Sequence, residues 1–232
     1  MPDHMQKLNN INTKFDRSIR KLVSCFFIVF VFVNCTLPPV TIKPELKHSA
    51  LIGKLPISIG VYYPPSFREY EYKSKHEMFK YKSRFLIGPA CVNFFNKILP
   101  AMFSRVEIFD TKPPYFPQKQ NVSAVLEPEI HTFQIDSMMN YGGFSSSMGY
   151  YSSATFLIRF YDMNGTVIDS WSISGDGYEP YSYFKHPLNQ RGRSAESAII
   201  DTIAQFMVGF QHRSEIKRWI QEHGFNKDAI SR

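Results

Sequence analysis

The polarity pattern divides the chain into a charged start, a nearly unbroken apolar run over 22–33, and a long region of short periodic segments. In residues 56–63, apolar side chains occupy every second position, which predicts a strand with one buried face. The same alternation returns in 154–160 and 167–173. Residues 162–165 between them read Asp-Met-Asn-Gly and predict a hairpin turn, because Asn-Gly adopts positive φ at little cost.

Apolar positions at helical spacing predict two longer helices and a short final one. The first helix opens at Gly88 and should kink or end just before Pro100, which cannot donate to the helical ladder. The second helix begins near Ser194, a residue type that caps helices well. The third helix runs from Ser214 to Gly224, where glycine ends it.

Three further segments predict strands. Residues 67–84 are charged and rich in Tyr, as exposed edge strands often are, and 106–109 form a short apolar strand. A strand over 124–135 is interrupted at Pro128, which indicates a bulge or an edge position. The order of elements predicts an α+β fold: a mainly antiparallel sheet with two longer helices packed on one face, plus a short C-terminal helix. We assign this single α+β domain to residues 55–232.

The N-terminus has the layout of a targeting signal. Residues 1–21 contain five basic and two acidic side chains and precede the apolar run 22–33. This order is typical of a secretory signal peptide. The run is also short for a bilayer-spanning helix, which needs about 20 apolar residues. We therefore predict a signal peptide over residues 1–34.

Residues 32–35, Phe-Val-Asn-Cys, resemble the lipobox of bacterial lipoproteins. The resemblance implies that Cys35 becomes a new N-terminus that carries diacylglycerol and palmitate. Residues 35–54 are rich in proline and predict a lipidated tether. Residue 36 is Thr rather than Asp, which by analogy with enteric lipoproteins predicts the periplasmic face of the cell outer membrane. An ordinary cleaved signal with an incidental cysteine is the alternative.

The mature chain also carries a family resemblance. Residues 59–71 read Ile-Gly-Val-Tyr-Tyr-Pro-Pro-Ser-Phe-Arg-Glu-Tyr-Glu, a helix opens at Gly88, and residues 124–128 read Ala-Val-Leu-Glu-Pro. These segments resemble uncharacterised envelope lipoproteins of Gram-negative proteobacteria. At fold level the pattern is similar to lipopolysaccharide-assembly and transport-auxiliary lipoproteins. The resemblance implies an accessory role in outer-membrane assembly, transport or secretion, and it supplies no catalytic residues.

Net charge and cysteine usage bear on two questions: whether the chain binds nucleic acid, and what role Cys91 has. The net charge is +7, and it falls to +4 once the five basic and two acidic residues of 1–34 are removed. No basic cluster accompanies this modest excess, so we expect no nucleic-acid partner. Cys91 lies on the apolar stripe of the first predicted helix and is interpreted as a small buried hydrophobe.

The sequence shows no pattern of residues typical of catalysis. None of the seven His is spaced as a metal pair, and motifs for nucleophilic serine, phosphate or dinucleotide binding are missing. Asp176, flanked by Gly175 and Gly177, is interpreted as a turn. Glu127 and Glu129 are interpreted as part of a solvated edge strand. We expect no metal, no cofactor and no enzymatic activity.

The most unusual segment is 138–153, which has no charge and is rich in Ser, Met, Gly and aromatic residues. We predict that it forms a long hairpin loop with an adaptable contact surface. A second candidate surface is the Tyr-rich strip 178–184. The candidate partner-binding residues are Tyr141, Phe144, Met148, Tyr150, Tyr151, Tyr181 and Tyr183.

These observations leave three functional hypotheses. The first is a non-catalytic accessory or structural subunit of an envelope transport, assembly or secretion complex, attached to the membrane through Cys35 and bound to envelope proteins. The alternative is a lipid- or glycan-binding carrier or sensor, and the third is a periplasmic enzyme. A cavity between helices and sheet would favour the carrier, and a filled core with an exposed aromatic loop would favour the accessory subunit. The four side chains expected to line such a cavity are Phe94, Phe95, Phe206 and Phe210.

Overall fold

A computed structural model describes residues 39–45, 53–74, 83–112, 122–142 and 145–223. Within 138–147 it describes the backbone of the strand residues but not their side chains. The described residues all belong to one compact unit, Pro39–Arg232. The expected signal peptide and Cys35 lie outside the described residues.

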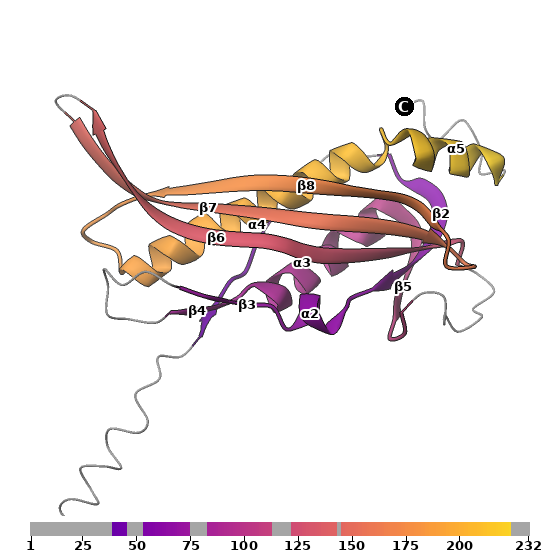
Figure 1. Cartoon of the computed structure of the whole chain (residues 1–232), viewed down its shortest axis with the longest axis horizontal. Helices are drawn as coiled ribbons and strands as arrows, with labels where there is room; N and C mark the ends of the chain where they lie inside the picture. Colours follow the sequence, from indigo (N-terminus) through magenta and orange to yellow (C-terminus); the bar gives the residue numbers. More distant parts are fainter. Residues whose placement is uncertain (1–38, 46–52, 75–82, 113–121, 143–144, 224–232) are drawn as a thin grey trace, which may run out of the picture. The chain divides into compact units, whose positions relative to one another are not determined.

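A five-stranded sheet forms the body of the domain, in the order β5-β2-β6-β7-β8 (Figure 1). The bounds of its strands are β2 Leu55–Tyr62, β5 Phe103–Phe109, β6 Ala124–Gly142, β7 Ser145–Asp162 and β8 Val167–Pro180. The pairs β6–β7 and β7–β8 are antiparallel, whereas β2 is parallel to both β5 and β6. The α+β class is confirmed. The sheet is more mixed than expected, because the first long strand inserts between two later ones, and parallel neighbours need crossover connections.

Helices α3 (Ile87–Met102) and α4 (Pro187–Phe210) cover one face of this sheet, and the short helix α5 (Ser214–Glu222) follows (Figure 1). Two glycines of β8 let α4 approach closely. A Cβ added at Gly177 would lie 2.0 Å from the carbonyl oxygen of Ser194, and one added at Gly175 would lie 2.2 Å from the backbone nitrogen of Thr202. The turn expected at Asp176 is therefore wrong: these glycines lie within a strand and serve helix packing.

Aromatic rings fill the space between helices and sheet. The centroids of Phe95 and Phe206 lie 5.6 Å apart, and Phe210 lies 5.6 Å from Phe206 and 5.3 Å from Phe160. Phe94, Phe95, Phe206 and Phe210 are each at most 1% exposed. The side chains that would have lined a carrier cavity instead pack against one another as a close-packed core.

A small second sheet lies beside the first, in the order β1-β4-β3, with bounds β1 Val40–Thr41, β3 Glu71–Lys73 and β4 Arg84–Leu86. The one-turn helix α2 (Pro65–Arg68) precedes β3. Strand β3 lies within the stretch 67–84, where exposed strands were expected, but Glu71 and Tyr72 are half-buried. Strand β4 overlaps this stretch only at Arg84, and the expectation of exposure is wrong for Phe85, which is fully buried. Strand β1 pairs with β4, and Ile42 is 5% exposed. Part of the segment assigned to the tether, 35–54, therefore packs on the domain.

The helix boundaries differ from expectation in two places. Helix α3 continues through Pro100 to Met102, because a proline this close to the helix end removes only one hydrogen bond of the ladder. Helix α4 begins at Pro187, seven residues before the expected start at Ser194. His186 Nδ1 accepts a hydrogen bond from the N–H of Leu188 at 3.3 Å, and proline suits the first helical position.

Strand β6 runs without a break through Pro128, which pairs with Ile158. The bulge lies two residues later, where the pairing register shifts between Ile130 and Thr132. Strand β2 pairs with β6 only over residues 124–126. Pro128 therefore stands on an open strand edge, as predicted, where a missing N–H costs no ladder bond.

Candidate functional site

The segment 138–153 is a paired hairpin and not the long loop predicted from its composition. Met138 pairs with Gly149, and Gly142 pairs with Ser145. Strand β8 pairs with β7 from Gly149 onward, so the hairpin beyond this point has no third strand (Figure 1). We call residues 138–148 the arm. Its Ser, Met and Tyr residues are compatible with strands, and composition alone cannot distinguish a paired strand from a loop.

The predicted contact residues of this hairpin divide between its two faces. The backbone of Tyr141 lies in the arm, but its side chain and Phe144 lie outside the described residues. Tyr150 is 3% exposed and points into the domain, so its ring packs in the interior and is not available to a partner. Burial raises the pKa of this phenol. The next residue, Tyr151, faces the other way and donates a hydrogen bond to the Asp176 carboxylate, while Met148 is half-buried.

The connection between β8 and α4, residues 181–186, is held in place by a buried side chain. Gln190 is fully buried and makes three hydrogen bonds to the backbone of this loop. Its Oε1 accepts from the N–H of Ser182 at 2.6 Å, and its Nε2 donates to the carbonyl oxygens of Ser182 at 3.1 Å and Lys185 at 2.9 Å. The N–H of Tyr181 also donates to the carbonyl oxygen of Met148 at 2.9 Å. The loop backbone is therefore fixed at both ends.

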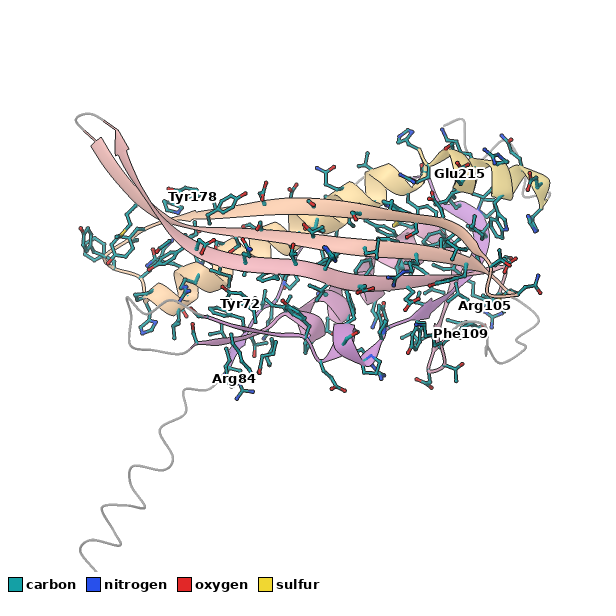
Figure 2. All side chains as sticks on the ribbon, in the orientation of Figure 1. Tyr72, Arg84, Arg105, Phe109, Tyr178 and Glu215 are labelled. Carbon is teal, nitrogen blue, oxygen red and sulfur yellow. The ribbon has the colours of Figure 1, made fainter. Side chains whose placement is uncertain are left out.

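This fixed loop presents two aromatic side chains to the outside. Tyr183 is 88% exposed and Phe184 is 100% exposed. The ring of Tyr181 lies between the interior and this surface, 6.4 Å from Tyr150 and 5.0 Å from Tyr183. Tyr178, at 51% exposure, stands at the end of β8 where the arm departs (Figure 2). We call Tyr178, Tyr181, Tyr183 and Phe184 the aromatic end.

Charged groups surround the aromatic end. Glu179 accepts from Lys185 at 2.9 Å and lies 3.6 Å from Arg193. Both cations are largely exposed, so the pairs contribute little to stability. Two positive side chains share one carboxylate, which leaves the rim of the aromatic end weakly basic.

A buried arginine lies beneath this surface. Arg191 is 5% exposed and donates to Ser74 Oγ at 2.8 Å and Ser83 Oγ at 3.3 Å, while its guanidinium stands 5.9 Å from the Phe85 ring centroid. Burial lowers the pKa of Arg191 below its usual range. Because both serines flank strands of the small sheet, Arg191 connects α4 to that sheet.

An open groove separates β3 from the free edge of β6. It has a volume of about 600 Å³. The hydroxyl of Tyr72 accepts from the N–H and donates to the carbonyl oxygen of Ile135, both at 3.3 Å, and so caps the free edge of β6 there (Figure 2). The residues lining the groove are Tyr70, Glu71, Tyr72, Lys73, Phe133, Gln134 and Asp136.

The paired carboxylates of β6 belong to a network with Tyr161 and Arg159. Glu127 is 3% exposed and accepts from the Tyr161 hydroxyl at 2.7 Å. Arg159 lies 2.7 Å from Glu129 and 4.0 Å from Glu127. Burial and the bond to Glu127 raise the pKa of Tyr161. The expectation of a solvated strand is wrong for Glu127, because Tyr161 and Arg159 cover it.

Cys91 is fully buried, and desolvation raises the pKa of its thiol, so the prediction of a small buried hydrophobe is confirmed. Across the described ranges, His, Cys, Asp and Glu side chains do not gather in threes as ligands of an ion would. In the same ranges, no helix combines the length and apolar character needed to cross a bilayer.

Comparisons with known proteins give likenesses of fold without likeness of sequence. No protein-family model matches the chain, and no curated protein matches it in sequence. Among solved structures, a neuraminyllactose-binding hemagglutinin homolog from Helicobacter pylori is similar over 78% of this chain and 98% of its own, with 12% identity and a TM-score of 0.50. This likeness shows a common fold.

Two further bacterial structures have TM-scores below 0.5. A protein of family DUF330 from Xanthomonas campestris covers 79% of this chain and 98% of its own, with 10% identity and a TM-score of 0.46. A minor lipoprotein from Acinetobacter baumannii covers 69% and 94%, with 10% identity and a TM-score of 0.39. The expected likeness to lipopolysaccharide-assembly and transport-auxiliary lipoproteins is not among these findings and stays a prediction.

The residues that organise the aromatic end were missing from the sequence-based candidates. Gln190 and Arg191 precede the expected helix start at Ser194, so they were placed in a connection and not on a helix face. The pair His186-Pro187 carried the signal for an earlier start, because proline favours the first helical position. Phe184 belonged to the strip 178–184, but nothing in the sequence distinguished its full exposure from the burial of Tyr150.

Proposed function

We propose that this chain is a bacterial envelope lipoprotein that acts as a non-catalytic accessory subunit, held by Cys35 at the periplasmic face of the outer membrane. The observation that carries the proposal is a filled core combined with an exposed, rigidly held aromatic end. A filled core leaves no room for a carried ligand between helices and sheet. An exposed aromatic surface is typical of a site that meets another molecule.

The arm is the element we propose for protein partners. It extends beyond β8, so the outer edge of each of its two paired strands is open to a further strand. It contains no charged residue, which removes one of the usual obstacles to strand addition. The fold shared with the Helicobacter pylori protein supports a bacterial setting.

Affinity isolation of the full-length chain from its own membranes tests this proposal. The arm variant replaces residues 139–148 with Asn-Gly, which closes the hairpin at the existing pair Met138–Gly149 with a two-residue turn. Ile108→Ser, at an exposed position of β5, is the control. We expect the wild type and the control to co-isolate a defined set of envelope proteins that the arm variant loses while staying folded and membrane-bound. Identical sets from all three would contradict the role of the arm.

Cys35→Ala tests the anchor separately. We expect this variant to appear in the soluble periplasmic fraction after cell disruption, whereas the wild type stays in the outer-membrane fraction through a high-salt wash. Retention of Cys35→Ala in the membrane would show that the apolar run 22–33 acts as an uncleaved anchor.

The groove between β3 and β6 favours the alternative, a glycan-binding role. Tyr70, Tyr72 and Phe133 offer rings beside the amide of Gln134, a combination suited to sugars. The name of the Helicobacter pylori protein includes an acidic sugar. In this chain, the carboxylates of Glu71 and Asp136 line the groove with Lys73, and Arg84 pairs with Glu71 at 2.6 Å, so the charges nearly balance, which favours a neutral glycan. Calorimetric titration with neutral oligosaccharides checks this role: binding that Gln134→Ala abolishes and the exposed Ser172→Ala leaves intact would support it.

A further inference from the structure

The exposed aromatic residues of this domain are concentrated at one place. The described residues include six large apolar side chains that are at least half exposed, and three of them, Tyr178, Tyr183 and Phe184, belong to the aromatic end. The other three, Ile108, Val167 and Val208, stand singly on β5, β8 and the C-terminal half of α4. Single exposed hydrophobics are ordinary, whereas a cluster indicates a surface that meets an apolar medium.

The backbone of the loop that carries these rings is held in place by hydrogen bonds. Gln190, fully buried, holds the backbone on both sides of Tyr183 and Phe184 through Ser182 and Lys185. The backbone that carries the two rings is consequently held in place before any contact is made, and both rings point outward. A pre-organised contact loses less conformational entropy on binding than a mobile one.

The aromatic end lies close to the point where the described chain begins. Val40 of β1 lies against α4, since a Cβ added at Gly192 would be 3.5 Å from Val40 Cγ1. Gly192 follows Pro187 by five residues, which corresponds to about 7.5 Å along the helix. Figure 1 shows β4, the start of α4 and the β8–α4 loop at the same end of the domain.

The length of the preceding chain limits how far this end can stand from a lipid anchor. Cys35 and Val40 are five residues apart, a distance that spans at most about 18 Å even when fully extended. An acyl chain on Cys35 would therefore keep the neighbourhood of Val40, and with it the aromatic end, near the surface of the bilayer.

We propose that Tyr183 and Phe184 insert into the headgroup region of the same lipid layer that holds Cys35, as a second, non-covalent membrane contact. This inference rests on the proposed lipid anchor. Tyrosine and phenylalanine are suited to this boundary because their rings are apolar while the tyrosine hydroxyl stays hydrated. Lys185 and Arg193 at the rim complement anionic phospholipid headgroups. The contact would fix the orientation of the domain, which a single flexible tether cannot do.

Tryptophan fluorescence of the full-length chain in vesicles tests the proposal. Phe184→Trp places a reporter in the β8–α4 loop. Val208→Trp, at a 58% exposed position near the C-terminal end of α4, is the matched control. The native Trp171 and Trp219 are at most 8% exposed, and their emission is subtracted with the wild type. Each purified protein is reconstituted into vesicles of phosphatidylethanolamine and phosphatidylglycerol, with and without brominated phospholipid.

We expect the emission of Phe184→Trp to shift to the blue and to be quenched by the brominated lipid, while Val208→Trp keeps the emission of an exposed indole and is not quenched. Equal, solvent-like emission from both variants would overturn the proposal. Protection of Phe184→Trp that appears only when co-isolated proteins are present would also overturn it, in favour of a protein contact. The intact mass of the purified wild type reports acylation of Cys35 independently of the aromatic contact, so failure of the anchor and failure of the aromatic contact are distinguishable.

Discussion

At the scale of single residues, buried polar side chains decide the geometry of the aromatic end. Gln190 and Arg191 are adjacent in the sequence and both at most 5% exposed, yet they point to different partners. Gln190 holds the β8–α4 loop, and Arg191 reaches the small sheet through Ser74 and Ser83. A buried polar group is tolerated when its hydrogen bonds are satisfied, so each of these residues specifies one arrangement of the backbone around it.

Replacing Gln190 tests this account of the loop. In Gln190→Ala, the N–H of Ser182 and two carbonyl oxygens lose their partner, and we expect the free energy of unfolding to fall by about 1–3 kcal/mol. Urea denaturation followed by circular dichroism measures this loss. Gln205→Ala, at an exposed position of the same helix, should leave the stability within about 0.5 kcal/mol of the wild type. A loss as small in Gln190→Ala as in the control would show that the loop is held by other contacts.

Cys91 predicts a specific pH dependence. Its buried thiol has a raised pKa, so the folded state keeps the thiol neutral at a pH where the unfolded chain ionises it. The contribution of this thiol to the free energy of unfolding is therefore fully present below the unfolded thiol pKa of about 8.5, and it declines as the pH rises above that value. The decline contributes up to about 1.4 kcal/mol per pH unit. Unfolding free energies measured across this range should fall less steeply in Cys91→Ala than in the wild type. Equal slopes would contradict the assignment.

At the scale of elements, the contact between α4 and β8 determines where the helix layer lies. Gly175 and Gly177 alternate with exposed side chains on β8 and face the backbone of α4. The Oγ1 of Thr202 donates to the Ala198 carbonyl oxygen of its own helix at 2.7 Å and lies 3.4 Å from the Ala154 carbonyl oxygen of β7. The helix and the strand consequently meet with little side-chain volume between them, which makes this contact intolerant of added atoms.

The two glycine environments of this fold provide a matched test. In Gly177→Ala, the new methyl group would collide with the Ser194 carbonyl oxygen, so we expect a loss of about 1–3 kcal/mol as α4 shifts away from β8. In Gly209→Ala, no atom lies within 4 Å of the new Cβ, and the higher helix propensity of alanine should make the variant equally or slightly more stable. Thermal denaturation compares the two. The interpretation fails if both variants behave alike.

Periodicity revealed most elements, and its failures have physical causes. The alternation in 154–173 and the stripe through Cys91 and Phe95 match buried positions, because one face of each element packs on the core. The first turns of α4 were missed since their stabilising contacts come from loop and sheet and not from an apolar stripe. The arm was mistaken for a loop because strand pairing depends on a partner that composition does not reveal. Of the candidate surface, Tyr181 and Tyr183 were identified, but the exposure of Phe184 follows from tertiary structure.

At the scale of the whole domain, two sheets share one helix layer. The five-stranded sheet packs on α3 and α4, and the small sheet β1-β4-β3 is connected to α4 through Arg191. Phe85 of β4 is fully buried beside the guanidinium. Since the small sheet has few residues of its own, its position depends on these contacts with α4 and on Tyr72, which bonds to Ile135 of β6.

Arg191→Met tests this dependence while keeping the length of the side chain. Replacing a buried charge with an apolar chain often leaves global stability little changed, so we expect the free energy of unfolding to stay within about 1.5 kcal/mol of the wild type. The bonds to Ser74 and Ser83 are lost, so the amides of β3 and β4 should exchange with deuterium faster than they do in the wild type. The amides of β7 should exchange at the wild-type rate. Arg193→Met, at an exposed position on the same helix, should exchange as the wild type does. Unchanged exchange in both variants would show that contacts other than the bonds of Arg191, such as those of Phe85 and Tyr72, place the small sheet.

Strand β1 also has a mechanical consequence. Val40 and Thr41 pair with Phe85 and Leu86, and Ile42 is buried, so a pull on the chain ahead of β1 is borne first by two residue pairs and by the packing of Ile42. If these contacts are lost, the next contact described toward the C-terminus is at Gly53, whose carbonyl oxygen accepts from Gln211 Nε2 at 2.7 Å, and the 13 residues before it lengthen the connection. These residues add at most about 50 Å of reach. If Cys35 carries the proposed lipid, this connection would have two lengths, one with the domain close to the bilayer and one with the domain further from it, and tension would select between them.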